Sequence, residues 1–160
     1  MAAAGDTIPD LELQVPGPDG MPQPVRTGEL FGQGRTVLFG VPGAFTPGCD
    51  RAHLPGFVER AAELKAKGVD RIVCMAVNDA FVMDAWARSR DVGDKIVMLA
   101  DGNGALTEAL GLQMDGSGFG LGTRCKRFAA VIDDGVITTI DVDESGAVDQ
   151  SSCSAVLARI

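Results

Sequence analysis

The sequence lacks the patterns that mark several common functional classes of protein. No apolar run approaches the roughly 18 residues of a membrane-spanning helix, which argues against a transmembrane protein. Basic residues are too few to favour nucleic acid or an anionic membrane as a partner, because the formal net charge is −8. There is no internal repeat, low-complexity tract or linker-like stretch, so we expect a single domain over residues 1–160.

The four cysteines and the one histidine show no arrangement typical of a metal site or a disulfide scaffold. The cysteines stand at positions 49, 74, 125 and 153, no two form a CxxC pair, and His53 is the only histidine. Residues 1–10 lack the apolar and Arg-rich patterns of targeting segments, so we expect a cytoplasmic protein with reduced thiols. The alternative is a chloroplast or mitochondrial location, if a transit peptide was removed before residue 1.

One cysteine, Cys49, stands where a helix is expected to begin. The apolar run Val37–Val41 predicts a buried strand that ends in a turn at Pro42. Thr46 is then expected to be the helix N-cap, with Pro47 at the first helical position. Cys49 therefore falls in the first turn, at the positive end of the helix dipole and among backbone N–H groups without intrahelical partners. Because this setting favours the thiolate, the sequence predicts a reactive sulfur nucleophile.

The rest of the chain alternates strand patterns with helix patterns. A loop rich in glycine and proline is expected through Pro24, and Pro55 is expected to kink the long helix that carries Cys49. The expected strands are 11–15, 71–77, 96–100 and the hairpin 127–133 with 136–142, and the expected helices are 27–31, 46–67, 79–89, 105–111 and 151–160. This order predicts an α/β protein with a mainly parallel core and the hairpin as antiparallel edge strands. It is the order that a thioredoxin-like fold requires, with a central mixed sheet flanked by helices.

The spacing P-x-x-x-T-x-x-C, formed by Pro42, Thr46 and Cys49, resembles that of the peroxiredoxins. The longer string VPGAFTPGC…HLPGFVE, followed by AVNDAFVMDAW, MLADGNG, GLGT and KRFAAVIDDG, is similar to the type II or peroxiredoxin-5 subgroup. The resemblance extends from about Ile8 to the C-terminus. It implies a thioredoxin-fold peroxidase that reduces hydrogen peroxide and alkyl hydroperoxides, with neither haem nor metal as a cofactor. Its implied reductants are thioredoxin, or glutaredoxin with glutathione.

The resemblance also implies a role for each matching residue. Cys49 would be the peroxidatic nucleophile, and Thr46 would supply a hydroxyl to the sulfur and the peroxide. Pro42 would shield the pocket, and Arg127 would be the cation beside the thiolate. A guanidinium offers several donors in a fixed fork, so it can hold both the sulfur and the peroxide oxygens. His53 shares a helix face with Cys49, but no third group of a triad is apparent, so we expect a structural role for it.

Two cysteines match positions that carry the resolving thiol in branches of the family, Cys153 in animal-type members and Cys74 in plant-type members. Most of the chain looks closer to the plant type, which favours Cys74 or direct reduction by glutaredoxin. However, Cys74 falls in an expected central strand, whereas Cys153 falls at the expected mobile start of the terminal helix. We therefore predict Cys153 as the resolving thiol, with Cys74 as the alternative, and we interpret Cys125 as incidental.

Two other functions could use the same fold or the same cysteine. A dithiol–disulfide oxidoreductase is disfavoured because no second cysteine forms a CxxC pair with Cys49. A peroxide sensor or a holdase chaperone would use Cys49 with little turnover, and this is the remaining alternative. The resemblance further implies a homodimer, for which the apolar residue Phe45 and the region Phe81–Trp86 are the expected contacts.

Overall fold

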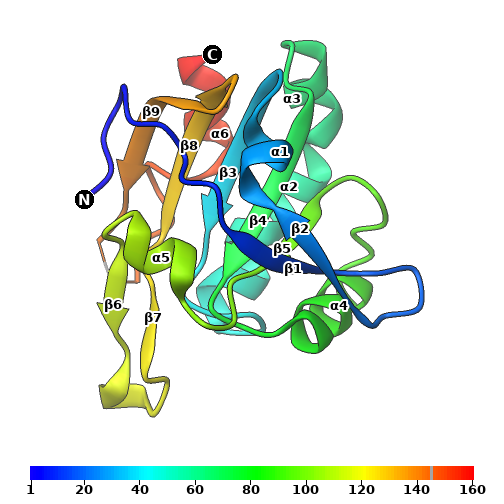
Figure 1. Ribbon diagram of the computed structural model, residues 1–160, viewed down its shortest axis with the longest axis vertical. Coiled ribbons are helices and arrows are strands. Elements are labelled where there is room, and N and C mark those ends of the chain that lie inside the picture. The colour runs from blue at the N-terminus through cyan, green and yellow to red at the C-terminus, as the bar shows by residue number, and fades with distance from the viewer. Residues whose placement is uncertain (145) are drawn as a thin grey trace.

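A central sheet with helices on both faces forms the fold (Figure 1), in a computed structural model that describes residues 1–144 and 146–160. The sheet has the strand order β2-β1-β5-β4-β3-β8-β9. Its strands are β1 (Glu12–Pro16), β2 (Pro22–Arg26), β3 (Arg35–Gly40), β4 (Arg71–Ala76), β5 (Val97–Ala100), β8 (Phe128–Asp133) and β9 (Val136–Val142). The helices are α1 (Thr27–Phe31), α2 (Leu54–Glu59), α3 (Ala61–Ala66), α4 (Ala80–Ser89), α5 (Ala105–Ala109) and α6 (Cys153–Arg159). Strands β3, β4 and β5 run parallel, and β8 is antiparallel to β3, which confirms the predicted mixed sheet.

The central strands are apolar throughout because both faces of the sheet are covered. Val37 and Phe39 of β3 point into a core shared with α2, α3, α4 and α6. Leu38, between them, points into a second core with residues of α1 and α5. Successive side chains of a strand alternate between the two faces, so a doubly covered strand is a continuous apolar run. This double burial is why the sequence pattern predicted these strands correctly.

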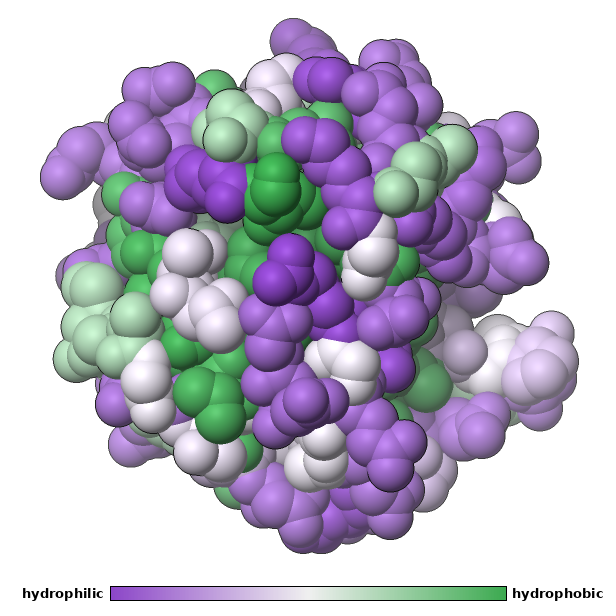
Figure 2. Space-filling model, turned by 90° about the horizontal axis from the view of Figure 1, so that it is seen from above, coloured by the Kyte–Doolittle hydropathy of each residue, from purple (hydrophilic) through white to green (hydrophobic). Residues whose placement is uncertain are grey.

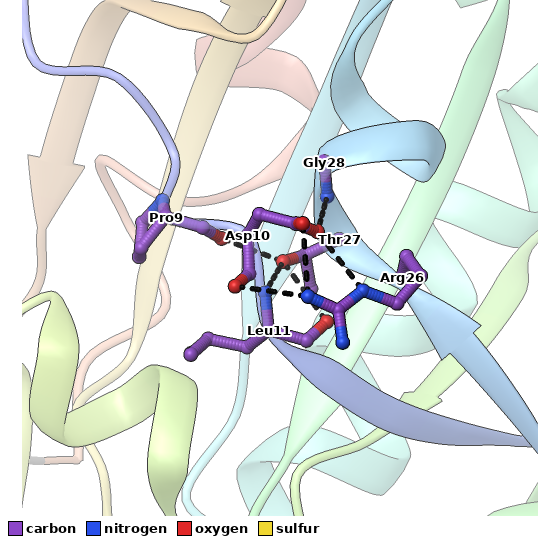
Figure 3. Close-up of polar contacts among 6 residues, drawn as sticks. All are labelled: Pro9, Asp10, Leu11, Arg26, Thr27 and Gly28. Atoms are coloured by element: carbon purple, nitrogen blue, oxygen red, sulfur yellow. Dashed lines mark hydrogen bonds and ion pairs between the residues drawn. The ribbon is translucent and has the colours of Figure 1, made fainter.

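A polar junction holds the start of α1 against the first strand (Figure 3). The Thr27 hydroxyl donates to the carbonyl of Pro9 at 2.6 Å and accepts from the backbone N–H of Leu11 at 2.7 Å. The Asp10 carboxylate accepts from the first-turn N–H of Gly28 at 3.0 Å and pairs with Arg26 at 2.9 Å. The Asp10 carboxylate thus satisfies one of the backbone donors that the first turn of α1 leaves open.

Three features of the sheet differ from the sequence-based expectation. Part of the expected loop through Pro24 is the strand β2, which pairs with β1 although it contains two prolines. The short strands β6 (Gln113–Asp115) and β7 (Thr123–Cys125), joined through a 3-10 turn at Ser117–Phe119, form a separate two-stranded arm that no pattern indicated. The hairpin does not form two edge strands, because β8 lies inside the sheet between β3 and β9 and only β9 is at the edge.

The predicted long helix 46–67 is divided into segments. Helical residues begin at Pro47, as expected, but Cys49–His53 form a π-helix in which the N–H of Leu54 donates to the carbonyl of Cys49. Pro55 follows at once in the first turn of α2. A proline cannot donate to the residue four positions back and its ring crowds that carbonyl, so the wider turn upstream accommodates it. A second interruption at Arg60 separates α2 from α3 and has no signal in the sequence.

The surface combines a polar covering with a few exposed apolar side chains. Hydrophilic residues cover much of the face seen in Figure 2, and apolar residues emerge between them. The aromatic residues with large exposed fractions are Phe45, Phe81 and Phe119. Within residues 1–144 and 146–160, no helix is long and apolar enough to cross a membrane.

Candidate functional site

The antiparallel pairing of β3 with β8 brings the two principal site residues together. Gly40, the last residue of β3, lies opposite Phe128, the first residue of β8. The chain leaves β3 towards Cys49, and Arg127 immediately precedes β8, so both residues lie at the same end of the sheet. A side chain at position 40 would collide with the Phe128 ring, since a Cβ there would lie 2.1 Å from a ring carbon. Glycine at this position therefore permits the pairing that assembles the site.

Arg127 donates directly to the sulfur of Cys49. Its Nη2 lies 3.3 Å from Cys49 Sγ, and both side chains are buried. Gly48 allows the guanidinium to approach, because a Cβ at that position would lie only 3.0 Å from Nη2. A charge-assisted contact in a buried setting stabilises a thiolate more strongly than the same contact in water. The structure thus brings together the cysteine and the arginine that the sequence analysis had paired only by resemblance.

His53 lies on the other side of the guanidinium and holds it. Arg127 Nη1 lies 2.9 Å from His53 Nδ1, and His53 Nε2 lies 2.9 Å from the carbonyl oxygen of Ser151. Burial and the nearby Arg127 charge together lower the pKa of His53 to about 4, although the hydrogen bond to Ser151 opposes them. The neutral ring therefore accepts from Arg127 at Nδ1 and donates to Ser151 from Nε2. His53 therefore contacts the arginine and not the sulfur, as expected of a residue with a structural role.

We expect the folding stability to fall by about 3 kcal/mol as the pH drops from about 6.5 to about 4, because of His53. The pKa of the folded-state imidazole is depressed, so in this window the unfolded chain binds a proton that the folded chain does not. The stability is therefore fully present above the unfolded pKa and is lost as the pH falls. Chemical denaturation at a series of pH values measures this dependence.

The matched variant for this experiment is His53→Gln. A glutamine amide can accept from Arg127 and donate to Ser151, but it does not titrate. We expect the pH dependence between about 6.5 and 4 to disappear in this variant. An unchanged slope would show that a group other than His53 is responsible.

The turn between β3 and the π-helix carries the two other predicted residues, Pro42 and Thr46. Contrary to expectation, the Thr46 side chain does not cap the helix; its hydroxyl donates to the carbonyl of Gly43 at 2.7 Å. This short contact within the turn competes with capping. The carbonyl of Pro42 accepts from Arg124 Nη1 at 3.2 Å. Arg124 therefore braces the turn, whereas Arg127 reaches the sulfur.

An apolar cleft of about 670 Å³ opens beside these residues. Pro42, Thr46, Gly48 and Arg127 line its inner end, while Cys49 itself is fully buried beneath them. The other lining residues come mainly from the β6–β7 arm and the end of β9, and are Met1, Pro47, Met114, Phe119, Leu121, Lys126, Val142, Asp143, Glu144 and Gly146. A small molecule in the cleft can therefore contact Thr46 and Arg127, the second of which contacts the buried sulfur.

Sequence reasoning missed the anchor of the π-helix, which is Asp50. Its carboxylate accepts from both Nε (2.8 Å) and Nη2 (2.6 Å) of Arg90, and from Nε1 of Trp86 at 2.9 Å. The Arg90 guanidinium, helped by the Trp86 indole, holds the pKa of Asp50 at about 2. The residue next to Cys49 is thereby fixed to α4. An acidic residue followed far along the chain by arginine is too common a pattern to have indicated this contact.

The other three cysteines are buried, and no disulfide is present in the part of the chain that the structure describes. Cys74 lies in β4 between two neighbouring strands, as predicted, and burial raises its pKa well above the usual value. Cys153 is buried at the start of α6, where burial raises its pKa to about 11. The start of this helix, which was expected to be mobile, is capped by Ser152, whose hydroxyl accepts from the N–H of Ala155 at 3.1 Å. Burial also raises the pKa of Cys125.

Comparisons with known proteins agree with this site. Residues 3–157 match the Redoxin family. Peroxiredoxin-2E-2, chloroplastic, of Oryza sativa subsp. japonica is 50% identical over 159 residues, which cover 97% of this chain and 71% of the relative. Peroxiredoxin-2B of Arabidopsis thaliana is 42% identical over 155 residues, which cover 97% of this chain and 96% of that relative.

A solved structure shows the same similarity in three dimensions. Reduced Prx3 in complex with H₂O₂ from Vibrio vulnificus has a TM-score of 0.92 and 46% identity, covering 99% of this chain and 96% of that one. Both the sequence identities and the superposition extend over nearly the whole chain, including the turn that carries Cys49. The chain therefore belongs to the peroxiredoxins, within their type II group, and is a thiol-dependent peroxidase.

Proposed function

We propose that Cys49 is the peroxidatic residue of this enzyme and that Arg127, Thr46 and Pro42 form its reaction pocket. The observation that carries this proposal is the 3.3 Å contact between Arg127 Nη2 and Cys49 Sγ at the inner end of the cleft. Of the four cysteines, Cys49 is the one for which the structure shows a side-chain cation donating to the sulfur. A thiolate held next to a positive charge is a nucleophile at neutral pH.

The reaction transfers one oxygen to sulfur. The Cys49 thiolate attacks the terminal oxygen of the peroxide, the O–O bond breaks with its electron pair going to the leaving oxygen, and a proton then converts that oxygen to water or an alcohol. Sulfur is oxidised to the sulfenic acid, and the peroxide is reduced. Negative charge moves from the sulfur to the leaving oxygen, so a cation that contacts both atoms stabilises the transition state.

Arg127 and Thr46 can both form hydrogen bonds with the peroxide while negative charge moves from the sulfur to the leaving oxygen. Arg127 Nη1 is occupied by His53 and Nη2 by the sulfur, whereas Nε is buried with no hydrogen-bond partner among the described residues. Each Nη nitrogen carries a second N–H, so an oxygen of the peroxide can accept from the guanidinium while the contacts with His53 and the sulfur persist. The Thr46 hydroxyl retains acceptor capacity for the peroxide O–H, because its single proton goes to Gly43. Pro42, partly buried at the cleft wall, limits the access of water.

The shape of the cleft supports alkyl hydroperoxides as substrates alongside hydrogen peroxide. Its outer wall carries the apolar side chains of Met114, Phe119 and Leu121. These residues can contact an alkyl tail while the peroxide group lies between Thr46 and Arg127.

Peroxide consumption tests this function, with thioredoxin and glutaredoxin–glutathione systems assayed in parallel. We propose that a thiol reductant of one of these two kinds restores Cys49 to the thiolate. Sustained turnover with either reductant supports the peroxidase. Oxidation that stops after one equivalent of peroxide with both reductants would favour the sensor or holdase alternative.

We propose Cys153 as the resolving thiol, although it is buried and its helix is capped by Ser152. Cys74 is paired with Phe39 on one side and Met98 on the other, so its release would break two strand ladders of the central sheet. Cys153 lies in a seven-residue terminal helix that packs on α2, and its release requires only the opening of that helix. Local opening of a terminal element costs much less than opening a central strand.

Peptide mapping after one equivalent of peroxide should find a Cys49–Cys153 disulfide. In Cys153→Ser, the sulfenic acid on Cys49 should persist and be trapped by a sulfenic-acid reagent. A Cys49–Cys74 disulfide, or a persistent sulfenic acid in the unmodified protein, would contradict the choice of Cys153.

Two further proposals concern assembly and location. We propose a homodimer that covers Phe45 and Phe81, which have about half of their surface exposed. Sedimentation at micromolar concentration should show a species with twice the 16.6 kDa mass of one chain, and the presence of monomer alone would contradict the proposal.

We propose that the protein works in the cytoplasm or in the chloroplast. The name of the rice relative favours the chloroplast, and cell fractionation tests this location.

A further inference from the structure

A ring of hydrogen bonds begins and ends at Arg127. The backbone N–H of Asp143 donates to the carbonyl of Arg127 at 2.9 Å. The Asp143 carboxylate accepts from the N–H groups of Asp149, Gln150 and Ser151 at 2.9, 2.8 and 3.0 Å, and from the Ser151 hydroxyl at 2.6 Å. The ring closes through the Ser151 carbonyl, which accepts from His53, whose Nδ1 accepts from Arg127 Nη1.

We infer that Asp143 is a positioning residue for Arg127: its carboxylate fixes the 149–151 turn, and through Ser151 and His53 this turn sets where the guanidinium meets the Cys49 sulfur. The inference rests on the proposed roles of Cys49 and Arg127. Asp143 acts through other residues and does not contact the sulfur.

The burial of the ring members makes this arrangement rigid. Asp143, Ser151, His53 and Arg127 are all buried, and the most exposed of them, Asp143, is only 8% exposed. Burial alone raises the pKa of Asp143, but the Ser151 hydroxyl and three backbone N–H groups outweigh it and lower the pKa overall. The carboxylate is therefore ionised at neutral pH and serves only as an acceptor. All four of its donors lie in one turn, so the carboxylate fixes the direction of the Ser151 carbonyl.

The variant Asp143→Asn tests the inference with little change of shape. Both carboxylate oxygens accept backbone N–H groups, so either orientation of the asparagine amide places its NH₂ group against a donor. The turn must shift, and the support of His53 shifts with it. We expect the rate of Cys49 oxidation by peroxide, and its rate of alkylation, to fall about tenfold, because small misplacements in a reaction site have large effects.

The matched control is Asp101→Asn. Asp101 is also a buried aspartate, and it accepts from two backbone N–H groups and the Thr107 hydroxyl at the start of α5. Its loss should lower the melting temperature without slowing either reaction of Cys49. If both variants slow Cys49 equally, the effect is a general loss of stability and the inference is wrong.

A double-mutant cycle with His53→Leu shows whether the effect passes through His53. Leucine removes both bonds of the imidazole, so Asp143→Asn should have little further effect in that background. Additive effects, or unchanged Cys49 rates in Asp143→Asn, would overturn the inference and leave the peroxidase function intact. Absence of peroxide turnover in the unmodified protein would instead overturn the proposed function. If Asp143→Asn does not fold, the same cycle with Ser151→Ala, which removes one of the four bonds, decides between these outcomes.

Discussion

Cys49→Ser is expected to lose more than about 10³-fold in the rate of peroxide reduction, because its hydroxyl is not ionised at neutral pH and cannot accept the peroxide oxygen as sulfur does. The fold should persist, since serine is nearly isosteric with cysteine and can still accept from Arg127 Nη2. The remaining thiols should not compensate, because burial raises the pKa of Cys74, Cys125 and Cys153 and keeps them protonated. Peroxide consumption with a saturating thiol reductant measures the loss.

Cys125→Ser is the matched control for Cys49→Ser. Cys125 is equally buried but lies in the core on the opposite face of the sheet, and its Sγ donates to the carbonyl of Lys126 at 3.0 Å. A serine hydroxyl can keep that bond, so the rate should remain close to that of the unmodified protein. Activity near that of the unmodified protein in Cys49→Ser, or its loss in Cys125→Ser, would mean that the wrong sulfur has been assigned.

Arg127→Lys should reduce the rate of Cys49 oxidation by about 10²-fold although the positive charge is kept. The guanidinium contacts His53 through Nη1 and the sulfur through Nη2, and each of these nitrogens has a second N–H in the same plane. A single ammonium cannot reproduce this planar set of donors.

Arg124→Lys separates this effect from a general effect of nearby arginines. Arg124 donates to the carbonyl groups of Leu121 and Pro42, and not to the sulfur. Its replacement should change the rate much less than Arg127→Lys does. The opposite order, with Arg124→Lys the more damaging variant, would identify Arg124 as the residue that activates Cys49.

The parts of the fold that the sequence predicted are those whose local pattern agrees with their final surroundings. The run around Val37–Phe39 is apolar because both faces of β3 are covered, and Asp79 before α4 caps that helix by accepting from Val82. The strand β2, with the sequence PQPVR, is mostly exposed and shows no alternation. It forms because β1 offers it a pairing edge, and this tertiary cause leaves no local pattern.

In the candidate site, too, some residues could be predicted from local sequence patterns and others could not. The turn and helix start around Cys49 could be predicted from local residue types, whereas the role of Arg127 came only from the resemblance to peroxiredoxins. Asp143 could not be found, because its meaning depends on a turn that begins six residues later and on His53, far earlier in the chain. The π-helix was also missed, although Pro55 correctly indicated a disturbance of regular helix geometry.

The pairing of β3 with β8 affects when the contacts around Cys49 form during folding. It joins an arginine and a cysteine that are 78 residues apart in the sequence, and the contact of His53 with Ser151 spans 98 residues. Contacts between such distant segments close large loops and form late in folding. A nascent or partly folded chain therefore holds Cys49 without the contact to Arg127. On the roles proposed for these two residues, we expect this sulfur to become sensitive to peroxide only when β3 and β8 have paired.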